Sequence, residues 1–161
     1  HNFYVPAGGD TPDPAVNPKF AHKLAFLDEM RACAALRCDS NRMILVGDLN
    51  VAPLEHDVWS HKQMLRVVSH TPLECEKLVA VQKEGGWIDA MRMHTPEPAK
   101  LYTWWSYRSP DWQTADKGRR LDHIWVAPAL ADRLTGMRVL KHSRGWLRPS
   151  DHVPVTATLE V

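Results

Sequence analysis

The stretch Met43-Ile44-Leu45-Val46-Gly47-Asp48-Leu49-Asn50 decides the fold that we expect for this chain. Four apolar residues, two of them β-branched, run directly into a glycine, and two polar residues then follow at alternate positions. This pattern predicts a buried strand that ends at Gly47 and carries Asp48 and Asn50 to the edge of a sheet. Residues two apart in an extended chain point the same way, so both side chains can face one small ligand. A simple turn is the alternative, because Gly, Asp and Asn are the commonest turn residues.

The composition bounds the class of protein. With 161 residues, 44% of them apolar and 24% charged, the chain has the size and balance of one globular domain, residues 1–161. No run approaches the roughly 18 apolar residues of a membrane span, so we expect no membrane partner. Three cysteines without metal-type spacing favour a reduced, cytoplasmic setting. Because the formal net charge is only +1, an anionic partner must be bound by a local patch of basic residues.

The first residues predict a chain that begins in the middle of a fold. The sequence opens with His1 rather than methionine, and residues 2–5 have the pattern of a strand that is already under way. Such a strand needs neighbours, and few sheet segments precede Gly47. We therefore expect the chain to be the C-terminal portion of a larger domain, whose N-terminal part is missing from this sequence.

Along the rest of the chain, helical and strand patterns alternate, which indicates a layered α/β domain. We expect helices at residues 19–36, 55–62 and 72–84, and a short helical turn at 87–93. We expect strands at residues 43–47, 101–107, 120–126, 139–140 and 153–161. In the strand at 120–126, Asp122 shares a face with Ile124 and Val126, a costly position for a carboxylate unless it is paired.

Further polar side chains gather at the ends of the predicted strands and at loop entries. They are Tyr4, Arg119, Arg120, Asp122, Asp151 and His152. Each of them could be an ordinary surface or turn residue, as such side chains usually are. Together with Asp48 and Asn50, however, these residues all lie at strand ends or loop entries. Their common position favours a single shared site.

Four motifs in a fixed order, together with an early Tyr-Val-Pro, resemble those of the exonuclease III family. The motifs are Gly-Asp-Leu-Asn (47–50), Tyr-Thr-Trp-Trp-Ser-Tyr-Arg (102–108), Arg-Leu-Asp (120–122) and Ser-Asp-His-Val-Pro-Val (150–155). The chain is similar over essentially its whole length to bacterial exodeoxyribonuclease III, within the endonuclease/exonuclease/phosphatase superfamily. The resemblance implies a four-layer α/β sandwich with two packed β-sheets. It also implies a DNA-repair enzyme for double-stranded DNA, which acts at abasic sites and 3′ ends as AP endonuclease, 3′→5′ exonuclease and 3′-phosphatase.

The resemblance assigns catalytic roles to Tyr4, Asp48, Asn50, Asp122 and His152. It implies that Asp48 orients and deprotonates the attacking water and that Asn50 steadies the phosphorane oxyanion. It implies also that Asp122 pairs with His152 and holds the imidazole against the scissile phosphate, and that Tyr4 lies against that phosphate. We also expect the protein to bind a Mg²⁺ ion, for which Mn²⁺ could substitute. The expected ligands are Asp48, Asn50, Asp151 and His152.

The resemblance places a DNA contact at Trp104, and we predict further DNA contacts at the nearby basic residues Arg108, Arg119 and Arg120. Trp104 lies where the family packs an aromatic residue near the abasic deoxyribose, and arginines meet backbone phosphates. Arg119 departs from relatives that have a tryptophan there, and a surface arginine without a function is the alternative. The family's early Asn and metal-binding Glu also have no counterpart in this sequence. We therefore expect the chain alone to be inactive, whereas the full-length enzyme would be a monomer.

Two other functions are alternatives to DNA repair. The same catalytic set serves superfamily members that hydrolyse phosphoesters other than DNA, such as inositol phosphates and sphingomyelin. A binding module or inactive fragment without catalysis is the third possibility. The tryptophan-rich segment 104–112 and the nearby arginines favour DNA, because aromatic groups can fill the space of a missing base and arginines bind phosphates.

Overall fold

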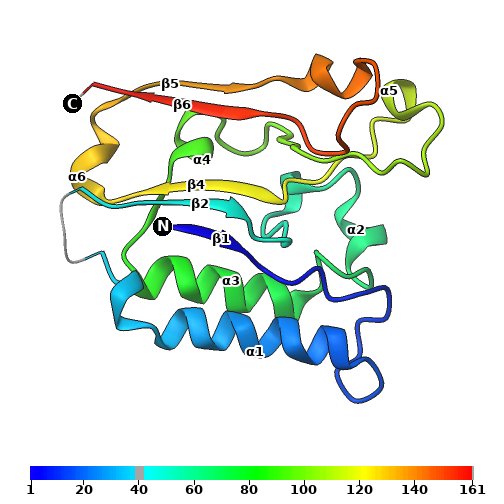
Figure 1. The fold of residues 1–161 in the computed structure, drawn as a ribbon, viewed down its shortest axis with the longest axis horizontal. Helices are drawn as coiled ribbons and strands as arrows, with labels where there is room; N and C mark the ends of the chain where they lie inside the picture. Colours follow the sequence, from blue (N-terminus) through cyan, green and yellow to red (C-terminus); the bar gives the residue numbers. More distant parts are fainter. Residues whose placement is uncertain (39–41, 161) are drawn as a thin grey trace.

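The structure, a computed structural model, describes residues 1–38 and 42–160. Its centre is a four-stranded mixed sheet in the order β1-β2-β4-β3 (Figure 1). The strands are β1 (Asn2–Tyr4), β2 (Ile44–Asp48), β3 (Ile88–Asp89) and β4 (Asp122–Val126). β1 runs parallel to β2, and β4 runs antiparallel to both β2 and β3. The predicted α/β class is confirmed, and the strand predicted at 43–47 is present as β2, which ends at Asp48, one residue beyond Gly47.

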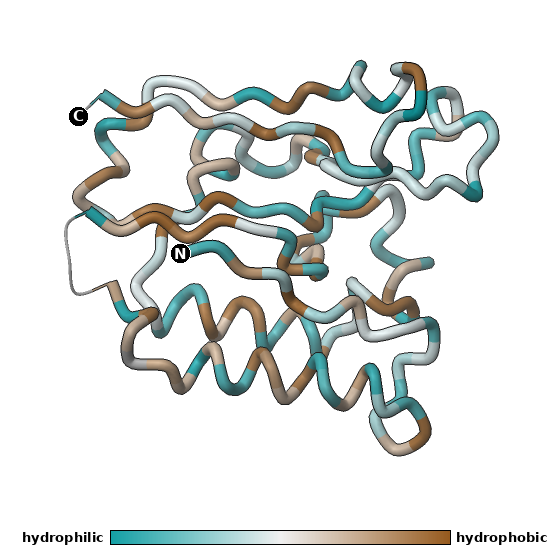
Figure 2. The backbone as a smooth tube through the Cα atoms, viewed as in Figure 1, coloured by the Kyte–Doolittle hydropathy of each residue, from teal (hydrophilic) through white to brown (hydrophobic). Residues whose placement is uncertain are grey.

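The register of this sheet places three polar residues in one row. Tyr4 of β1 pairs with Asp48 of β2, and Asp48 pairs with Asp122 of β4. Figure 2 shows how the hydrophobic part of β2 gives way to hydrophilic residues at the end of the strand. The apolar part of the strand is held in the core, and its polar end therefore reaches the edge where the row lies.

Helices α1 (Pro18–Ala32) and α3 (Pro72–Glu84) cover one face of the sheet (Figure 1). α3 begins at a capping box, in which Thr71 and Glu74 satisfy each other's backbone N–H groups. Both helices carry a proline in the first turn, where its missing N–H costs nothing. The core between the helices and the sheet contains Val5, Leu27, Leu45, Leu78, Val81 and Trp125.

The other face is covered by a second, antiparallel sheet of β5 (Leu134–Val139) and β6 (Val155–Leu159). Apolar side chains of both sheets meet between them. They are Ile44, Ile88, Ile124, Val126, Leu134 and Leu159. Two short helices, α4 (Ala90–His94) and α6 (Pro128–Ala131), lie at this interface. The described residues therefore stack helices, a mixed sheet and a second sheet, which are three of the four layers of the predicted sandwich.

The remaining helical segments are short. They are η1 (Ala34–Leu36), η2 (Glu55–Asp57), α2 (His61–Met64), α5 (Trp112–Ala115) and η3 (Lys141–Gly145). The helix predicted at 19–36 is interrupted at Cys33, whose backbone is extended, and the helix predicted at 55–62 is two separate turns. The predicted turn at 87–93 begins as β3 and continues as α4. No helix in the described parts of the chain is both long and apolar enough to cross a bilayer.

The segment 101–107 is not a strand, contrary to the prediction. Its backbone bonds to two different neighbours: Thr103 and Trp104 donate to the Arg119 carbonyl oxygen, whereas Trp105 donates to that of Asp151. Trp104 forms only isolated bridges, because a segment that changes partner after two residues cannot continue a ladder. The segment instead ties the start of β4 to the approach of β6.

Candidate active site

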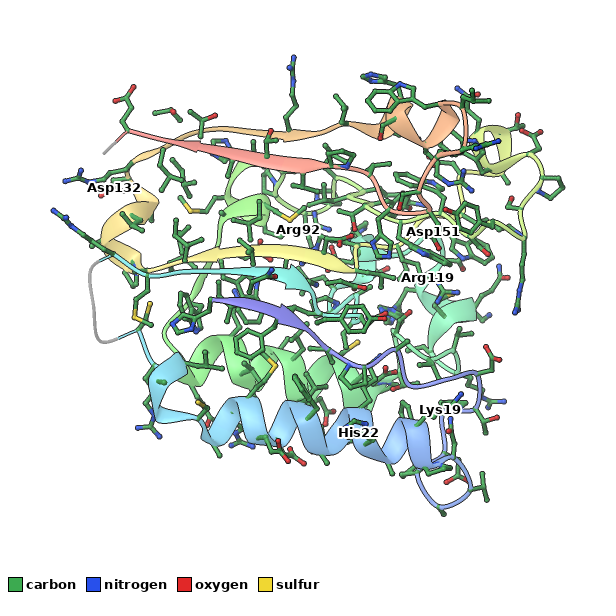
Figure 3. The ribbon with its side chains drawn as sticks, viewed as in Figure 1. Lys19, His22, Arg92, Arg119, Asp132 and Asp151 are labelled. Carbon is green, nitrogen blue, oxygen red and sulfur yellow. The ribbon has the colours of Figure 1, made fainter. Side chains whose placement is uncertain are left out.

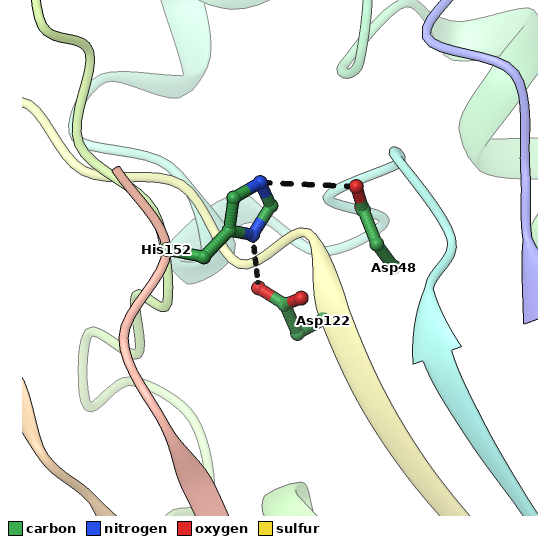
Figure 4. Close-up of side chains that lie close together, drawn as sticks. All are labelled: Asp48, Asp122 and His152. Atoms are coloured by element: carbon green, nitrogen blue, oxygen red, sulfur yellow. Dashed lines mark hydrogen bonds and ion pairs between the residues drawn. The ribbon is translucent and has the colours of Figure 1, made fainter. Parts of the chain in front are cut away.

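Asp48, Asp122 and His152 form a close cluster at the polar edge of the central sheet (Figure 4). Asp48 ends β2, Asp122 begins β4, and His152 lies just before β6. His152 Nδ1 lies 2.8 Å from Asp122 Oδ2, and His152 Nε2 lies 3.8 Å from Asp48 Oδ2. The imidazole is thus held between two carboxylates, with the Asp122–His152 hydrogen bond that the resemblance implied.

Gly47 allows this arrangement. Its φ of 144° lies in a region that glycine adopts at little cost. A Cβ atom at this position would lie 1.9 Å from the Phe3 carbonyl oxygen, which is impossible. Only glycine lets β1 approach β2 this closely, and the approach brings Tyr4 alongside Asp48. Tyr4 is 66% exposed there, so a substrate at the site can reach its side chain.

Asn50 follows Asp48 in a turn rather than in the strand. Its φ is 51°, a left-handed conformation that asparagine tolerates, and its backbone N–H donates to Asp48 Oδ1 at 3.0 Å. Its side-chain Nδ2 donates to Asp48 Oδ2 at 2.9 Å and to the Val5 carbonyl oxygen at 2.8 Å. Strand and turn are therefore both present in residues 43–50, one after the other. Because both amide hydrogens are used, Asn50 could donate to a substrate oxygen only by releasing one of these bonds.

Burial and a neighbouring like charge raise the pKa of Asp48 to about 6. Burial disfavours the charged carboxylate and Asp122 adds repulsion, whereas the charge of His152 acts in the opposite direction. The pKa of His152 is raised as well: burial lowers it, but the hydrogen bond and the charge of Asp122 outweigh burial. A carboxylate with a pKa this close to neutral suits a general base, and a cationic imidazole suits a phosphate ligand.

The rate of hydrolysis at this site is expected to rise as the pH increases through about 6. Asp48 accepts a proton only when it is ionised, and its raised pKa moves that ionisation upward from the ordinary 3.8. Single-turnover rates measured from about pH 4.5 to pH 8 test this expectation. A rate that does not change with pH across this range would contradict the assignment of Asp48 as the base.

The cluster fits a divalent cation. One oxygen from each aspartate and one ring nitrogen of His152 lie within 4.8 Å of one another, and this is the one such group found in the described part of the chain. Mg²⁺ prefers oxygen ligands and keeps several waters, so one or two carboxylates and a substrate phosphate suffice to bind it. The predicted ligand set shares Asp48 and His152 with this cluster.

Asp151, the other predicted carboxylate ligand, lies beside the cluster and is not one of its three members. Its Oδ2 accepts a hydrogen bond from Trp104 Nε1 at 3.0 Å. The Arg119 guanidinium carbon lies 5.0 Å from the centre of the Trp104 ring, and Arg119 Nη1 donates to Ser69 Oγ at 2.9 Å. Figure 3 shows Asp151 and Arg119 in the right half of the view, far from Asp132 near the left end. Arg119 therefore covers a face of the Trp104 ring, and its guanidinium is held in place by the hydrogen bond to Ser69.

Comparison with known proteins agrees with this geometry. The sequence profile of the Endonuclease/Exonuclease/phosphatase family matches residues 3–152. The chain belongs to this family. It is 28% identical to exodeoxyribonuclease III of Haemophilus influenzae over 162 aligned residues, which cover 97% of this chain and 59% of that protein. It is 33% identical to the DNA repair nuclease APEX1 of Danio rerio over 119 residues, which cover 74% of this chain and 36% of that protein.

Solved structures of this family share the fold. An AP endonuclease from Archaeoglobus fulgidus superposes with a TM-score of 0.88 at 27% identity, over 99% of this chain and 60% of that one. The 3′-5′ exonuclease NExo of Neisseria meningitidis superposes with a TM-score of 0.83 at 30% identity, over the same shares of the two chains. This chain thus spans about three fifths of the length of these relatives and of the Haemophilus enzyme.

In this member of the Endonuclease/Exonuclease/phosphatase family, Arg120, which was predicted as a DNA contact, lies in the interior of the domain. Its side chain is fully buried, and its Nε and Nη2 each donate to Asp57 at 2.8 Å. Its Nη1 donates to Asp89 at 2.6 Å, and Arg92 binds the same Asp57 carboxylate. A buried guanidinium that is paired on both sides cannot reach a backbone phosphate. Arg108, in contrast, is exposed and stays a predicted DNA contact.

Replacing Asp57 with asparagine is expected to destabilise the domain by about 3–5 kcal/mol. The change leaves Arg120 buried without its main counter-charge, and an uncompensated buried charge carries a penalty of this size. Urea unfolding measures the effect. The matched control is Glu84→Gln, which breaks an exposed pair with Arg31 and should leave the free energy of unfolding almost unchanged. An Asp57→Asn effect no larger than that of the control would contradict the structural role.

Sequence reasoning missed Lys23, a buried cation below the site. Its Nζ donates to the Asn50 carbonyl oxygen at 2.8 Å and pairs with Glu74 Oε1 at 2.5 Å, and both charged side chains are fully buried. The ion pair therefore anchors the turn after Asp48 to helices α1 and α3. Helical spacing could have revealed it, because Lys23 lies on the buried helix face, three residues after Phe20.

Proposed function

We propose that this chain carries the catalytic end of a metal-dependent DNA-repair phosphodiesterase. Its activities are 3′→5′ exonuclease on duplex DNA, cleavage at abasic sites and 3′-phosphatase. The observation that carries the proposal is the cluster itself: a carboxylate of raised pKa, Asp48, faces an imidazole, His152, that a second carboxylate holds. Relatives named exodeoxyribonuclease III and DNA repair nuclease support it, as does a Neisseria 3′ phosphatase solved with a product DNA hairpin.

The geometry supports a division of labour between the three residues. Asp48 accepts a proton from the attacking water, and the two hydrogen bonds from Asn50 fix the direction of its carboxylate. Asp122 binds His152 at Nδ1, which leaves Nε2 free to donate to an oxygen of the scissile phosphate. Tyr4, next to Asp48 in the sheet, lies against the same phosphate. The base, Asp48, and the hydrogen-bond donor to the phosphate, His152 Nε2, thus lie on two sides of the place where the phosphate would bind.

A bound Mg²⁺ supplies positive charge that neutralises the phosphate oxygens as negative charge builds up on them. We propose that the Asp48 and Asp151 carboxylates hold it, with Asn50 Oδ1 as a neutral oxygen ligand, and that Mn²⁺ can replace it. His152, predicted from the sequence as a further ligand, instead serves the phosphate, because a ring nitrogen that donates a hydrogen bond cannot bind a metal ion. Asp151 is held at the rim of the cluster by the Trp104 indole. We propose also that the protein acts as a monomer in the cytoplasm.

A panel of substrates tests the proposal on the natural protein. Labelled duplexes with an abasic site, a recessed 3′ end or a 3′-phosphate are incubated with Mg²⁺, with Mn²⁺ and with EDTA. We expect cleavage of at least one duplex with either metal and none with EDTA. Hydrolysis of inositol phosphates or sphingomyelin without any cleavage of DNA would overturn the substrate class. Binding of DNA without cleavage of any duplex in the panel would overturn the proposal that the protein is an enzyme.

A further inference from the structure

Two loops beside the active site, residues 105–116 and 141–150, are locked together into one surface, which we call the two-loop platform. Arg144 joins them: it is only 6% exposed, and its guanidinium carbon lies 4.8 Å from the Tyr107 ring centre and 5.5 Å from that of Trp112. Its Nε also donates to the Trp105 carbonyl oxygen at 3.1 Å. A desolvated arginine between two aromatic rings is a strong, directional contact.

Two further contacts hold the platform at its edges. Lys141 Nζ pairs with Asp116 Oδ1 at 2.8 Å, and the Tyr107 hydroxyl donates to the Pro149 carbonyl oxygen at 2.7 Å. The loop 141–150 is therefore fastened to its neighbour near both ends. A surface that is ordered before it meets a ligand loses little conformational entropy on binding.

The loop 141–150 exposes two large apolar side chains, Trp146 and Leu147, at its tip. Trp146 is 57% exposed and Leu147 is 95% exposed, although both are large apolar side chains. The loop that carries them, 141–150, contains two arginines, one lysine and one histidine and no acidic residue. An apolar tip within a basic loop suits a ligand that combines flat apolar surfaces with negative charge, and a nucleic acid is such a ligand.

The tip borders the catalytic cluster through two open grooves that share a wall. One groove, of about 460 Å³, is lined by Trp146, Leu147, His152, Val153 and Pro154, with other residues of the same loop. The other, of about 410 Å³, is lined by Asp48 and Asp122 and again by Val153 and Pro154. The two grooves therefore form a continuous path from the carboxylates, past Val153 and Pro154, to Trp146.

We propose that Trp146 stacks on a nucleobase next to the scissile phosphate, and that Leu147 packs against the edge of the same base. This inference rests on the proposed function, since it requires DNA at the cluster. Stacking of a base on an aromatic side chain is tolerant of sequence, which suits an enzyme that must act at any position. Arg148, the exposed arginine of this loop, meets a flanking phosphate. The platform thereby fixes where the strand lies relative to Asp48.

Photocrosslinking tests the contact directly. A duplex carries 5-iododeoxyuridine beside the scissile phosphate, or about one helical turn away as a control, and is irradiated with the natural protein in EDTA so that it is not cleaved. We expect a crosslink only from the first position, mapped by mass spectrometry to Trp146. A crosslink that maps elsewhere, or none at all while the DNA is bound, would overturn the proposal.

Variants connect the contact to activity. Trp146→Ala should raise KM for duplex DNA about 5- to 100-fold, in line with the loss of one stacked base, and Trp146→Phe should restore most of the affinity. Leu73→Ser, a matched change at another exposed apolar residue outside both grooves, should leave KM unchanged. If wild-type protein binds no DNA, the proposed function itself fails. If Trp146→Ala changes only self-association or protein binding, the function stands and the platform has a protein partner, which overturns this inference.

Discussion

Replacement of Asp48 by asparagine is expected to slow DNA cleavage by about 10²–10⁴-fold, the usual cost of losing a general base. Asparagine keeps the size of the side chain and can still accept the hydrogen bond from the Asn50 backbone N–H, but it cannot take a proton from water. Binding of duplex DNA should survive or tighten, because a negative charge near the phosphate is removed. Single-turnover rates at saturating protein separate this chemical effect from binding.

The control for this variant is Asp28→Asn, which neutralises an aspartate that is 54% exposed and paired with Lys77 on the helical layer. It should leave the rate of cleavage unchanged, because that layer covers the face of the sheet away from β5 and β6. An Asp48→Asn variant that retained most of the wild-type turnover would exclude Asp48 as the base.

Replacement of His152 by asparagine is expected to lower the rate of cleavage by a similar factor, about 10²–10⁴-fold. The change removes the cationic donor to the phosphate, and it leaves Asp122 without its imidazole partner at 2.8 Å. Asp122→Asn should act through the same ring, so the double variant should be little slower than His152→Asn alone. Single-turnover assays of the three proteins measure this coupling, with the exposed His94→Asn as the control. Fully multiplicative effects would show that Asp122 and His152 act separately.

The elements predicted best from the sequence are those whose formation depends on neighbouring residues. The run from Met43 to Gly47 forms a strand within one residue of the predicted bounds, and the helix predicted at 72–84 is α3. The pairing of Asp122 with His152 came from the family resemblance, since the two residues are 30 positions apart and no local rule brings them together. The structure shows that pairing, whereas the chemical roles of the site residues stay predictions.

The predictions failed where distant partners decide the outcome. Arg120 looked like a phosphate contact because it is a basic residue near the tryptophan-rich segment, but it is buried against Asp57, 63 residues away. The segment 101–107 alternates like a strand, yet its backbone divides its hydrogen bonds between the approaches of β4 and β6. Lys23 was overlooked because a lysine on a helix is usually solvated. Each error concerns a polar group whose partner the sequence does not reveal.

The central claim is that the cluster of Asp48, Asp122 and His152 is the place where the scissile phosphate of DNA and a divalent metal ion bind. The most direct test is a crystal structure of the natural protein with a cleaved duplex and Mn²⁺, whose anomalous signal locates the metal. We predict a phosphate oxygen about 2.6–3.2 Å from His152 Nε2 and a metal peak within bonding distance of the Asp48 or Asp151 carboxylate. A phosphate and metal bound at any other part of the surface, with this cluster left free, would contradict the account.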